Sequence, residues 1–183
     1  MKNPFFLNSM TVVVLFLVSA CSNPNDQQNM NKEYNHAIQE VTEVNVSQEK
    51  QVNDPELNAV YQQYLILTEA LVDSDLTKAK IAAHTIEAGA ASLKNGEIIK
   101  STASKISSAG TIDDGRNAYA VLSNELISLI KKSGMKTGEI YVDYCPMAQN
   151  NQGGYWLSNK KSIQNPYYGE SMLTCGEVKE AIL

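Results

Sequence analysis

The 183-residue sequence has no cluster of basic residues, no glycine-rich phosphate-binding loop and no recognisable pair of nucleophile and base. The first absence argues against nucleic acid as a partner, because no run of lysines is present to displace the counterions of a phosphate backbone. The other two absences predict that the protein is not an enzyme. Histidine is also scarce, with two in the chain, which disfavours a zinc site built on imidazole.

No apolar stretch at the N-terminus is long enough to cross a bilayer as a permanent helix. The run MTVVVLFLVSA, residues 10–20, is too short for that role. With Lys2 before it and small residues at its end, it predicts a secretory signal peptide over residues 1–20. The following VSAC, which ends in Cys21, resembles the lipobox of bacterial lipoproteins, where the cysteine sulfur receives a diacylglyceryl group. The alternative is an ordinary signal peptide with an incidental cysteine.

Lipidation would make Cys21 the first residue of the mature chain. The acyl chains would anchor it in the bacterial cell envelope, at the periplasmic face or the outer membrane. Without residues 1–20 the chain keeps 14 basic and 20 acidic residues, a net charge of −6. This balance argues against electrostatic adhesion to anionic lipid, so the acyl chains alone are expected to attach the protein to the membrane.

The remaining sequence divides into a polar stretch and one domain. Residues 21–53 are rich in Asn, Gln and Glu and are expected to form the lipidated cysteine and a flexible tether. Residues 54–183 are long enough for a single core. Within them we expect a helical bundle over 54–134 and a cap rich in Cys, Met and Trp over 138–178.

Four amphipathic segments predict a mainly α fold, an up-down bundle of about four helices. Asp54 and Asp75 are suited to the N-caps of the first two helices. Gly96 is expected to end the second helix. The third is predicted from about residue 97 to 108, and the fourth from about 112 to 132 with lysines in its last turn.

The character of the sequence changes after Gly138. The segment EIYVDYC alternates, with Ile140, Val142 and Tyr144 on one side, which predicts a half-buried strand. NNQGG predicts a turn, and YWLS a second short strand. We therefore expect a small C-terminal β-hairpin and loop that cap the bundle.

Cys145 and Cys175, the other two cysteines, each have a methionine close by, Met147 and Met172. One interpretation is a disulfide, because an exported protein meets an oxidising environment and two thiols remain once Cys21 is lipidated. Such a bridge would close a loop of about 30 residues and contribute roughly 3–4 kcal/mol to stability.

The other interpretation is a soft-metal site. On a strand, Cys145 and Met147 would project to the same face about 6.5–7 Å apart, within reach of one ion. In a turn or at a helix start, Met172 and Cys175 are neighbours. Two thiolates and two thioethers suit Cu(I) better than a hard cation. Each methionine has a simpler alternative role as a filler of the core.

The segment from Tyr141 to Val178 resembles the signature of the DUF3347 family of exported bacterial proteins. The family pattern is roughly C-P-M, G-x-x-W-L-S, I-x-N-P-Y-x-G and M-x-x-C-G. The helices resemble the family as well, so the likeness covers about residues 54–180. The positions that match the pattern are Cys145, Pro146, Met147, Gly153, Trp156, Leu157, Ser158, Ile163, Asn165, Pro166, Tyr167, Gly169, Met172, Cys175 and Gly176.

The resemblance implies a lipoprotein of Bacteroidetes-like bacteria. Related domains accompany the adaptor subunits of copper and heavy-metal efflux pumps, which implies copper or another soft metal as a ligand. One departure concerns the histidines that many relatives carry near an Arg-x-His-Phe sequence. Here Arg116 is kept, but Asp114 and Ala118 stand where histidine is expected. Any metal site that those histidines complete is therefore in doubt for this chain.

The sequence thus predicts a lipid-anchored envelope domain that binds a soft metal ion, Cu(I), for sequestration or for handover to heavy-metal efflux components. The expected metal ligands are Cys145, Met147, Met172 and Cys175. The alternative is a non-catalytic structural or interaction lipoprotein whose Cys145–Cys175 disulfide locks the C-terminal cap.

Overall fold

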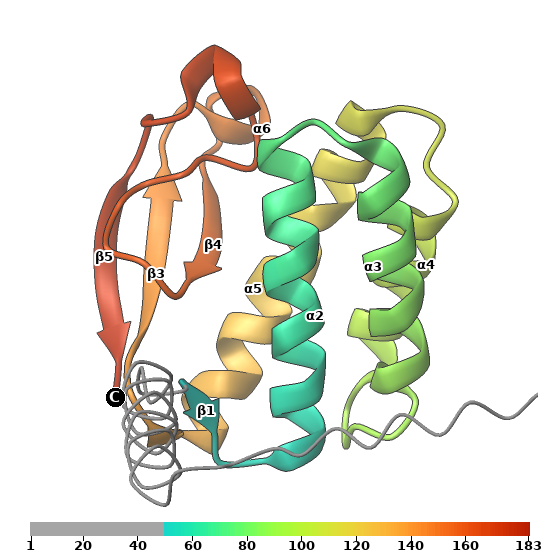
Figure 1. Ribbon diagram of the computed structural model, residues 1–183, viewed down its shortest axis with the longest axis vertical. Coiled ribbons are helices and arrows are strands. Elements are labelled where there is room, and N and C mark those ends of the chain that lie inside the picture. Colours follow the sequence, from blue (N-terminus) through green and yellow to red (C-terminus); the bar gives the residue numbers. More distant parts are fainter. Residues whose placement is uncertain (1–49) are drawn as a thin grey trace, which may run out of the picture. The chain divides into compact units, whose positions relative to one another are not determined.

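Four long helices form the larger part of the computed structural model, which describes residues 50–183 (Figure 1). They are α2 (Pro55–Val72), α3 (Leu76–Ala90), α4 (Glu97–Ser107) and α5 (Ile112–Ser133). Each helix packs on the next in the chain, and α5 returns to α2, as the short links between them require. The expectation of a mainly helical fold is confirmed. The predicted signal peptide, Cys21 and most of the predicted tether lie outside the described residues.

Within residues 50–183, no helix is both long and apolar enough to cross a bilayer. The expected N-caps are present, since Asp54 accepts a hydrogen bond from the Leu57 amide and Asp75 from the Lys78 amide, each at 2.9 Å. The expected end of the second helix is wrong, because α3 stops at Ala90. The chain reverses so tightly there that a Cβ on Gly96 would lie 2.2 Å from the Ala90 carbonyl oxygen.

The cap is a three-stranded antiparallel sheet, which is one strand more than the expected hairpin. Its order is β4 (Gly154–Ser158), β3 (Ile140–Cys145), β5 (Glu177–Ile182). The sequence EVKEAI of β5 gave no strand signal because five of its six residues are exposed at the sheet edge. A second, two-stranded sheet pairs β1 (Gln51–Val52) with β2 (Met135–Thr137) beside the start of α2.

The central strand β3 was expected to be half-buried, and this was wrong. Tyr141 and Asp143, on the face expected to be exposed, are 5% and 0% exposed. The chain that follows β4 passes over this face, where a Cβ on Gly176 would meet Trp156 at 2.8 Å and Ile163 at 3.4 Å. We call residues 159–176 the covering loop. The other face of the sheet lies toward α5, where Val142 and Ile127 line a common hollow.

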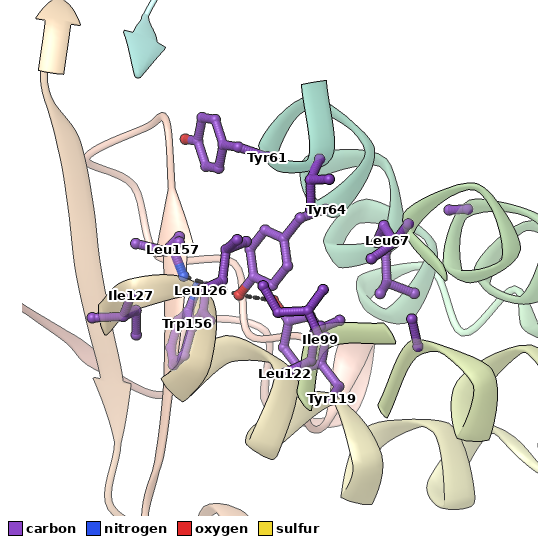
Figure 2. Close-up of a cluster of buried hydrophobic side chains, with 14 of the residues drawn as sticks. Tyr61, Tyr64, Leu67, Ile99, Tyr119, Leu122, Leu126, Ile127, Trp156 and Leu157 are labelled. Atoms are coloured by element: carbon purple, nitrogen blue, oxygen red, sulfur yellow. Dashed lines mark hydrogen bonds between the residues drawn. The ribbon is translucent and has the colours of Figure 1, made fainter. Parts of the chain in front are cut away.

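A buried network of hydroxyl groups joins the helices to the sheet (Figure 2). The Tyr64 hydroxyl of α2 accepts hydrogen bonds from the Leu157 amide of β4 at 3.1 Å and from the Tyr119 hydroxyl of α5 at 2.7 Å. With both acceptor positions used, its own proton points to Ser123 Oγ, 2.7 Å away. Burial raises the pKa of Tyr64 to about 12, so the phenol stays neutral and can donate.

Asp143 stands out in the sheet because neither of its buried carboxylate oxygens has a hydrogen-bond partner. It lies opposite Trp156 on one neighbouring strand and Val178 on the other. Burial raises the pKa of Asp143 from 3.8 to about 7, because a charge without a partner is poorly solvated there. The folded protein therefore holds a proton that the unfolded chain releases at a lower pH.

Replacement of Asp143 by Asn is expected to change how stability depends on pH. Between about pH 4 and pH 7 only the folded form of the natural protein keeps this proton, so its free energy of unfolding falls as pH rises, by at most about 4 kcal/mol. Above pH 7 this contribution levels off. Urea unfolding across that range is the measurement, and Asp143→Asn should lack the slope. The exposed Glu170→Gln is the control, and identical slopes in all three proteins would contradict the assignment.

Candidate functional site

Cys145 and Cys175 meet at the end of β3, remote from the start of α2 (Figure 1). Their Sγ atoms lie 2.6 Å apart as free thiols. This is well inside the roughly 3.5–4.0 Å of ordinary non-bonded contacts. Cys145 is buried and Cys175 is partly exposed. The hydrogen bond with the Cys145 thiol, together with burial, raises the pKa of Cys175.

The position of Cys175 is fixed by Asn165 of the covering loop. Asn165 is fully buried, and its Nδ2 donates to the Cys175 carbonyl oxygen at 2.8 Å. Its Oδ1 accepts from the Tyr167 amide at 2.8 Å, and its own amide donates to the Leu173 carbonyl at 2.8 Å. Both ends of this side chain are therefore used to close the loop beneath Cys175. The sequence pattern included Asn165 but gave no sign of this role.

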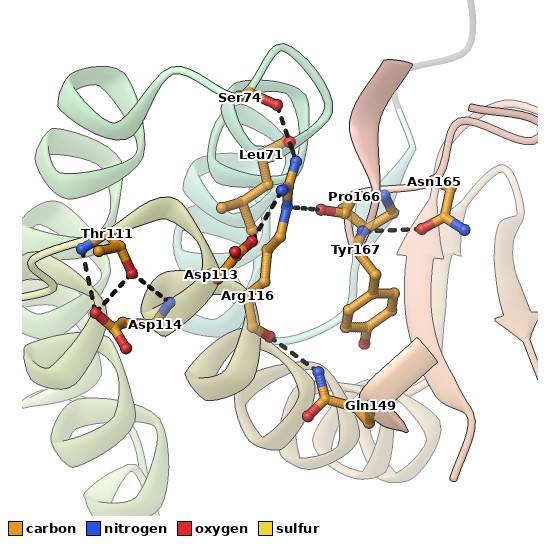
Figure 3. Close-up of polar contacts among 10 residues, drawn as sticks. All are labelled: Leu71, Ser74, Thr111, Asp113, Asp114, Arg116, Gln149, Asn165, Pro166 and Tyr167. Carbon is orange, nitrogen blue, oxygen red and sulfur yellow. Dashed lines mark hydrogen bonds and ion pairs between the residues drawn. The ribbon is translucent and has the colours of Figure 1, made fainter. Parts of the chain in front are cut away.

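Arg116, the single arginine of the sequence, ties the covering loop to the bundle (Figure 3). Its Nε donates to the Pro166 carbonyl at 2.9 Å, while Nη2 donates to the Leu71 carbonyl at 3.0 Å and to Ser74 Oγ at 2.9 Å. The side chain is 11% exposed and pairs with Asp113 at 3.2 Å. Only a planar guanidinium supplies donors in so many directions at once, so Arg116 positions the loop that carries Cys175.

Met147 does not take the expected strand position beside Cys145, whereas Met172 lies one turn before Cys175, as the i, i+3 spacing predicts. The strand β3 ends at Cys145, so Met147 lies in the following turn with a helical backbone (φ −84°, ψ −15°), and the expected strand geometry was wrong. Met147 is 42% exposed. Met172 lies in the 3₁₀ helix η1 (Gly169–Met172), one turn before Cys175, whose amide donates to its carbonyl at 3.0 Å. Among residues 50–183, neither thioether accepts a hydrogen bond from a cysteine thiol.

No group of three or more His, Cys, Asp and Glu side chains gathers as a metal site within residues 50–183. The residues that replace the expected histidines have structural roles. Asp114 forms a capping box with Thr111, the N-cap of α5, and Ala118 packs against the core. The structure thus brings together the two thiols of the predicted ligand set, and no histidine of residues 50–183 joins them.

The turn between β3 and β4 is strained. Residues Gln149, Asn150 and Asn151, in the short helical segment α6 (Ala148–Asn151), have φ values of 52°, 57° and 65°. Such left-handed backbone costs about 1–2 kcal/mol for each ordinary residue. Gln149 Nε2 donates to the carbonyl of Arg116 at 3.4 Å. The helix that carries the guanidinium therefore also contacts the turn that follows Cys145.

Substitution Arg116→Met is expected to lower the free energy of unfolding by about 2–3 kcal/mol, because it leaves the Leu71 and Pro166 carbonyls without their charged donor. Lysine at this position should restore part of the loss, since it keeps the charge but not the fork of donors. Urea unfolding followed by the fluorescence of Trp156 provides the measurement.

The control for Arg116 is Asp113→Asn, which removes only the exposed ion pair and should change stability by less than about 0.5 kcal/mol. If the Arg116 and Asp113 variants lost equal free energies of unfolding, the stabilisation would come from the ion pair rather than from the carbonyl contacts, which would contradict the prediction.

Comparison with known proteins gives one match. The model of the DUF3347 family, described as a protein of unknown function, matches residues 60–138. No curated protein and no solved structure matches the chain. The match spans most of the bundle, including Tyr64 and Arg116, and ends before the cysteine-containing segment on which the resemblance was first noticed. Over these helices, the match supports the resemblance to the DUF3347 family.

Proposed function

We propose that this protein is a non-catalytic lipoprotein of the bacterial cell envelope whose Cys145–Cys175 pair closes as a disulfide and locks the cap. The observation that carries this proposal is the 2.6 Å between the sulfur atoms. A disulfide bond is about 2.05 Å long, so the pair must approach by only about half an ångström. Two thiolates on one ion, each about 2.3 Å from it, stand roughly 3.8 Å apart in tetrahedral geometry, so metal binding must separate them by more than an ångström.

Formation of the bridge removes two protons and two electrons from the thiols. A disulfide-bearing oxidant of the envelope would accept the electrons by exchange. The bridge would hold the covering loop, which with α2 borders a hollow of about 330 Å³ lined by Ile66, Trp156 and Lys160. A fixed loop gives this hollow one shape, as a surface that binds a partner requires.

The anchor and the bridge can be tested together on the protein isolated from its native envelope. Its intact mass should correspond to a chain that begins at Cys21 and carries acyl groups. The mass should gain no alkyl group from iodoacetamide until a reductant is added. A chain that retains its signal peptide without acyl groups would contradict the lipidation of Cys21. Alkylation of both thiols without reductant would contradict the Cys145–Cys175 disulfide.

Substitution Cys175→Ser is expected to lower the free energy of unfolding of the oxidised protein by about 3–4 kcal/mol, as the loss of a 30-residue loop closure implies. In the presence of a reductant the substituted and natural proteins should differ by less than about 1 kcal/mol, because Cys175 is only partly buried. Equal free energies of unfolding for the natural protein and the Cys175→Ser variant under oxidising conditions would contradict the proposed disulfide.

A second candidate function is Cu(I) binding by the reduced pair, which is favoured by the partial exposure of Cys175 beside a buried thiol. Two thiolates are soft ligands and suit Cu(I) without further donors. Met147 and Met172 would need to turn toward the ion to add thioethers. The family resemblance supplies the context, in which the ion would be sequestered or passed to efflux components.

Copper binding is tested by titrating the reduced protein with Cu(I) against a chromophoric chelator. One ion should bind for each chain, and Cys145→Ser with Cys175→Ser should abolish binding because both ligands are lost. The pair Met147→Leu and Met172→Leu is the matched control and should weaken affinity by less than about tenfold if the thiolates carry the site. Binding that survives loss of both cysteines would remove this site.

A further inference from the structure

The two thiols of the sulfur pair differ in their access to solvent. Cys145 is fully buried, whereas Cys175 is partly exposed. The rate of thiol–disulfide exchange depends on access to the sulfur that is attacked, and cysteines buried in a core are inert. The pair is therefore asymmetric, because a second molecule can reach the sulfur of Cys175 but not that of Cys145.

The surroundings of Cys145 are tightly packed. Cys145 lies opposite Gly154 of β4 in the sheet. A Cβ on Gly154 would lie 2.7 Å from the ring of Tyr167 and 2.9 Å from the Cβ of Ala148. Tyr167 is 6% exposed and Ala148 is fully buried. A space that does not admit one methyl group also excludes a sulfur atom that belongs to a second molecule.

The direction of attack favours the same sulfur. Exchange proceeds by attack of a thiolate on a disulfide sulfur, and the attacking, central and leaving sulfurs lie nearly on one line. A molecule that attacks Cys175 Sγ must therefore approach from the side opposite Cys145 Sγ. Cys145 lies in the core and Cys175 lies in the covering loop, so that side is the outer side of the loop.

The covering loop keeps its place while the thiols are free. Asn165 Nδ2 donates to the Cys175 carbonyl at 2.8 Å, and the Cys175 amide donates to the Met172 carbonyl at 3.0 Å. Arg116 Nε donates to the Pro166 carbonyl at 2.9 Å (Figure 3). None of these hydrogen bonds involves a sulfur atom. Opening of a disulfide would therefore leave the two sulfurs as neighbours, so that exchange can run in both directions without unfolding of the cap.

We propose that Cys175 is the exchange site of the pair, where a disulfide-bearing redox partner forms a mixed disulfide that Cys145 then resolves. This inference rests on the proposed function, because it names the residue through which the proposed disulfide forms and opens. The partner is defined by its chemistry, a reactive disulfide carried by a small molecule or by a protein.

Closure of the pair takes two exchange steps. In the first, the Cys175 thiolate attacks one sulfur of the partner's disulfide, and the partner's other sulfur leaves with the electron pair of the broken bond and takes up a proton. In the second, Cys145 Sγ attacks Cys175 Sγ, and the partner's remaining sulfur leaves toward solvent and takes up the second proton. The two thiols are oxidised, and the partner's disulfide is reduced to two thiols that carry both protons.

The test compares two variants that each keep one thiol of the pair. Both are made in residues 22–183, which contain the whole compact unit Gln48–Leu183 and leave out Cys21. In the folded state, Cys145→Ser should take up one glutathione from oxidised glutathione, which intact mass will detect. Cys175→Ser should react about a hundredfold more slowly, because its remaining thiol is buried. Equal rates, or a faster reaction of Cys175→Ser, would overturn the proposal.

Two controls separate the effect of the fold from that of the substitutions. In concentrated urea the two variants should react at rates within about threefold of each other, because both thiols are then exposed. If the folded-state difference persisted in urea, burial would not be its cause and the assignment would be wrong. The natural reduced protein needs no substitution, and limiting iodoacetamide should label Cys175 before Cys145. The opposite order of labelling would contradict the exchange site.

The reverse reaction locates the mixed disulfide in the natural protein. When the oxidised protein is mixed with reduced glutathione and quenched with acid, peptide mapping should find glutathione on Cys175. Glutathione on Cys145 instead would overturn the proposal. Replacing oxidised glutathione by an oxidised dithiol protein identifies the source of the disulfide, because the natural type of partner should react faster with Cys175 at equal concentration. Failure of the exchange site leaves the proposed disulfide standing, since that fails only if both thiols are alkylated in the envelope without reductant.

Discussion

The cap obtains part of its backbone hydrogen bonding from side chains of the bundle. The β4 strand lies at a sheet edge, and its buried Leu157 amide is satisfied by the Tyr64 hydroxyl rather than by another strand. Likewise, the Pro166 carbonyl of the covering loop is satisfied by Arg116. A buried amide or carbonyl without a partner costs about 1–3 kcal/mol, so the sheet cannot settle away from the helices without losing these bonds.

This dependence connects the two halves of the sequence. The family model matches residues 60–138, which include Tyr64, Arg116 and Tyr119 but none of the cap strands. Yet Tyr64 and Arg116 direct polar atoms to backbone beyond residue 150. The matched helices of this chain therefore carry donors and acceptors that pair with backbone groups of its C-terminal segment. The long motif from Cys145 to Gly176 belongs to the same folding unit as the matched helices.

Local signals in the sequence predicted local structure well. Asp54 and Asp75 are N-caps because each side chain only has to accept a hydrogen bond from an amide in the first turn of its own helix. That interaction depends on residues that are close in the sequence. Contacts across the fold gave no such signal. Leu157 and Tyr64, which share a hydrogen bond, are 93 residues apart in the sequence. The alternation around Asp143 predicted an exposed face, but the covering loop buries that face. The thiols were foreseen as a pair, whereas the place of Met147 depended on where β3 ends.

The hydrogen bonds that hold the covering loop also affect the distance between the two sulfur atoms. Cys145 is fixed by the central strand, so any change in the separation of the sulfurs must come from Cys175. That residue is held by Asn165, and Arg116 holds Pro166 next to it. Closing to a disulfide would require a shift of about half an ångström, while binding a metal ion would require a larger displacement of the loop that these hydrogen bonds oppose. The same arrangement that orders the cap would therefore set the balance between the two proposed chemistries of the thiols.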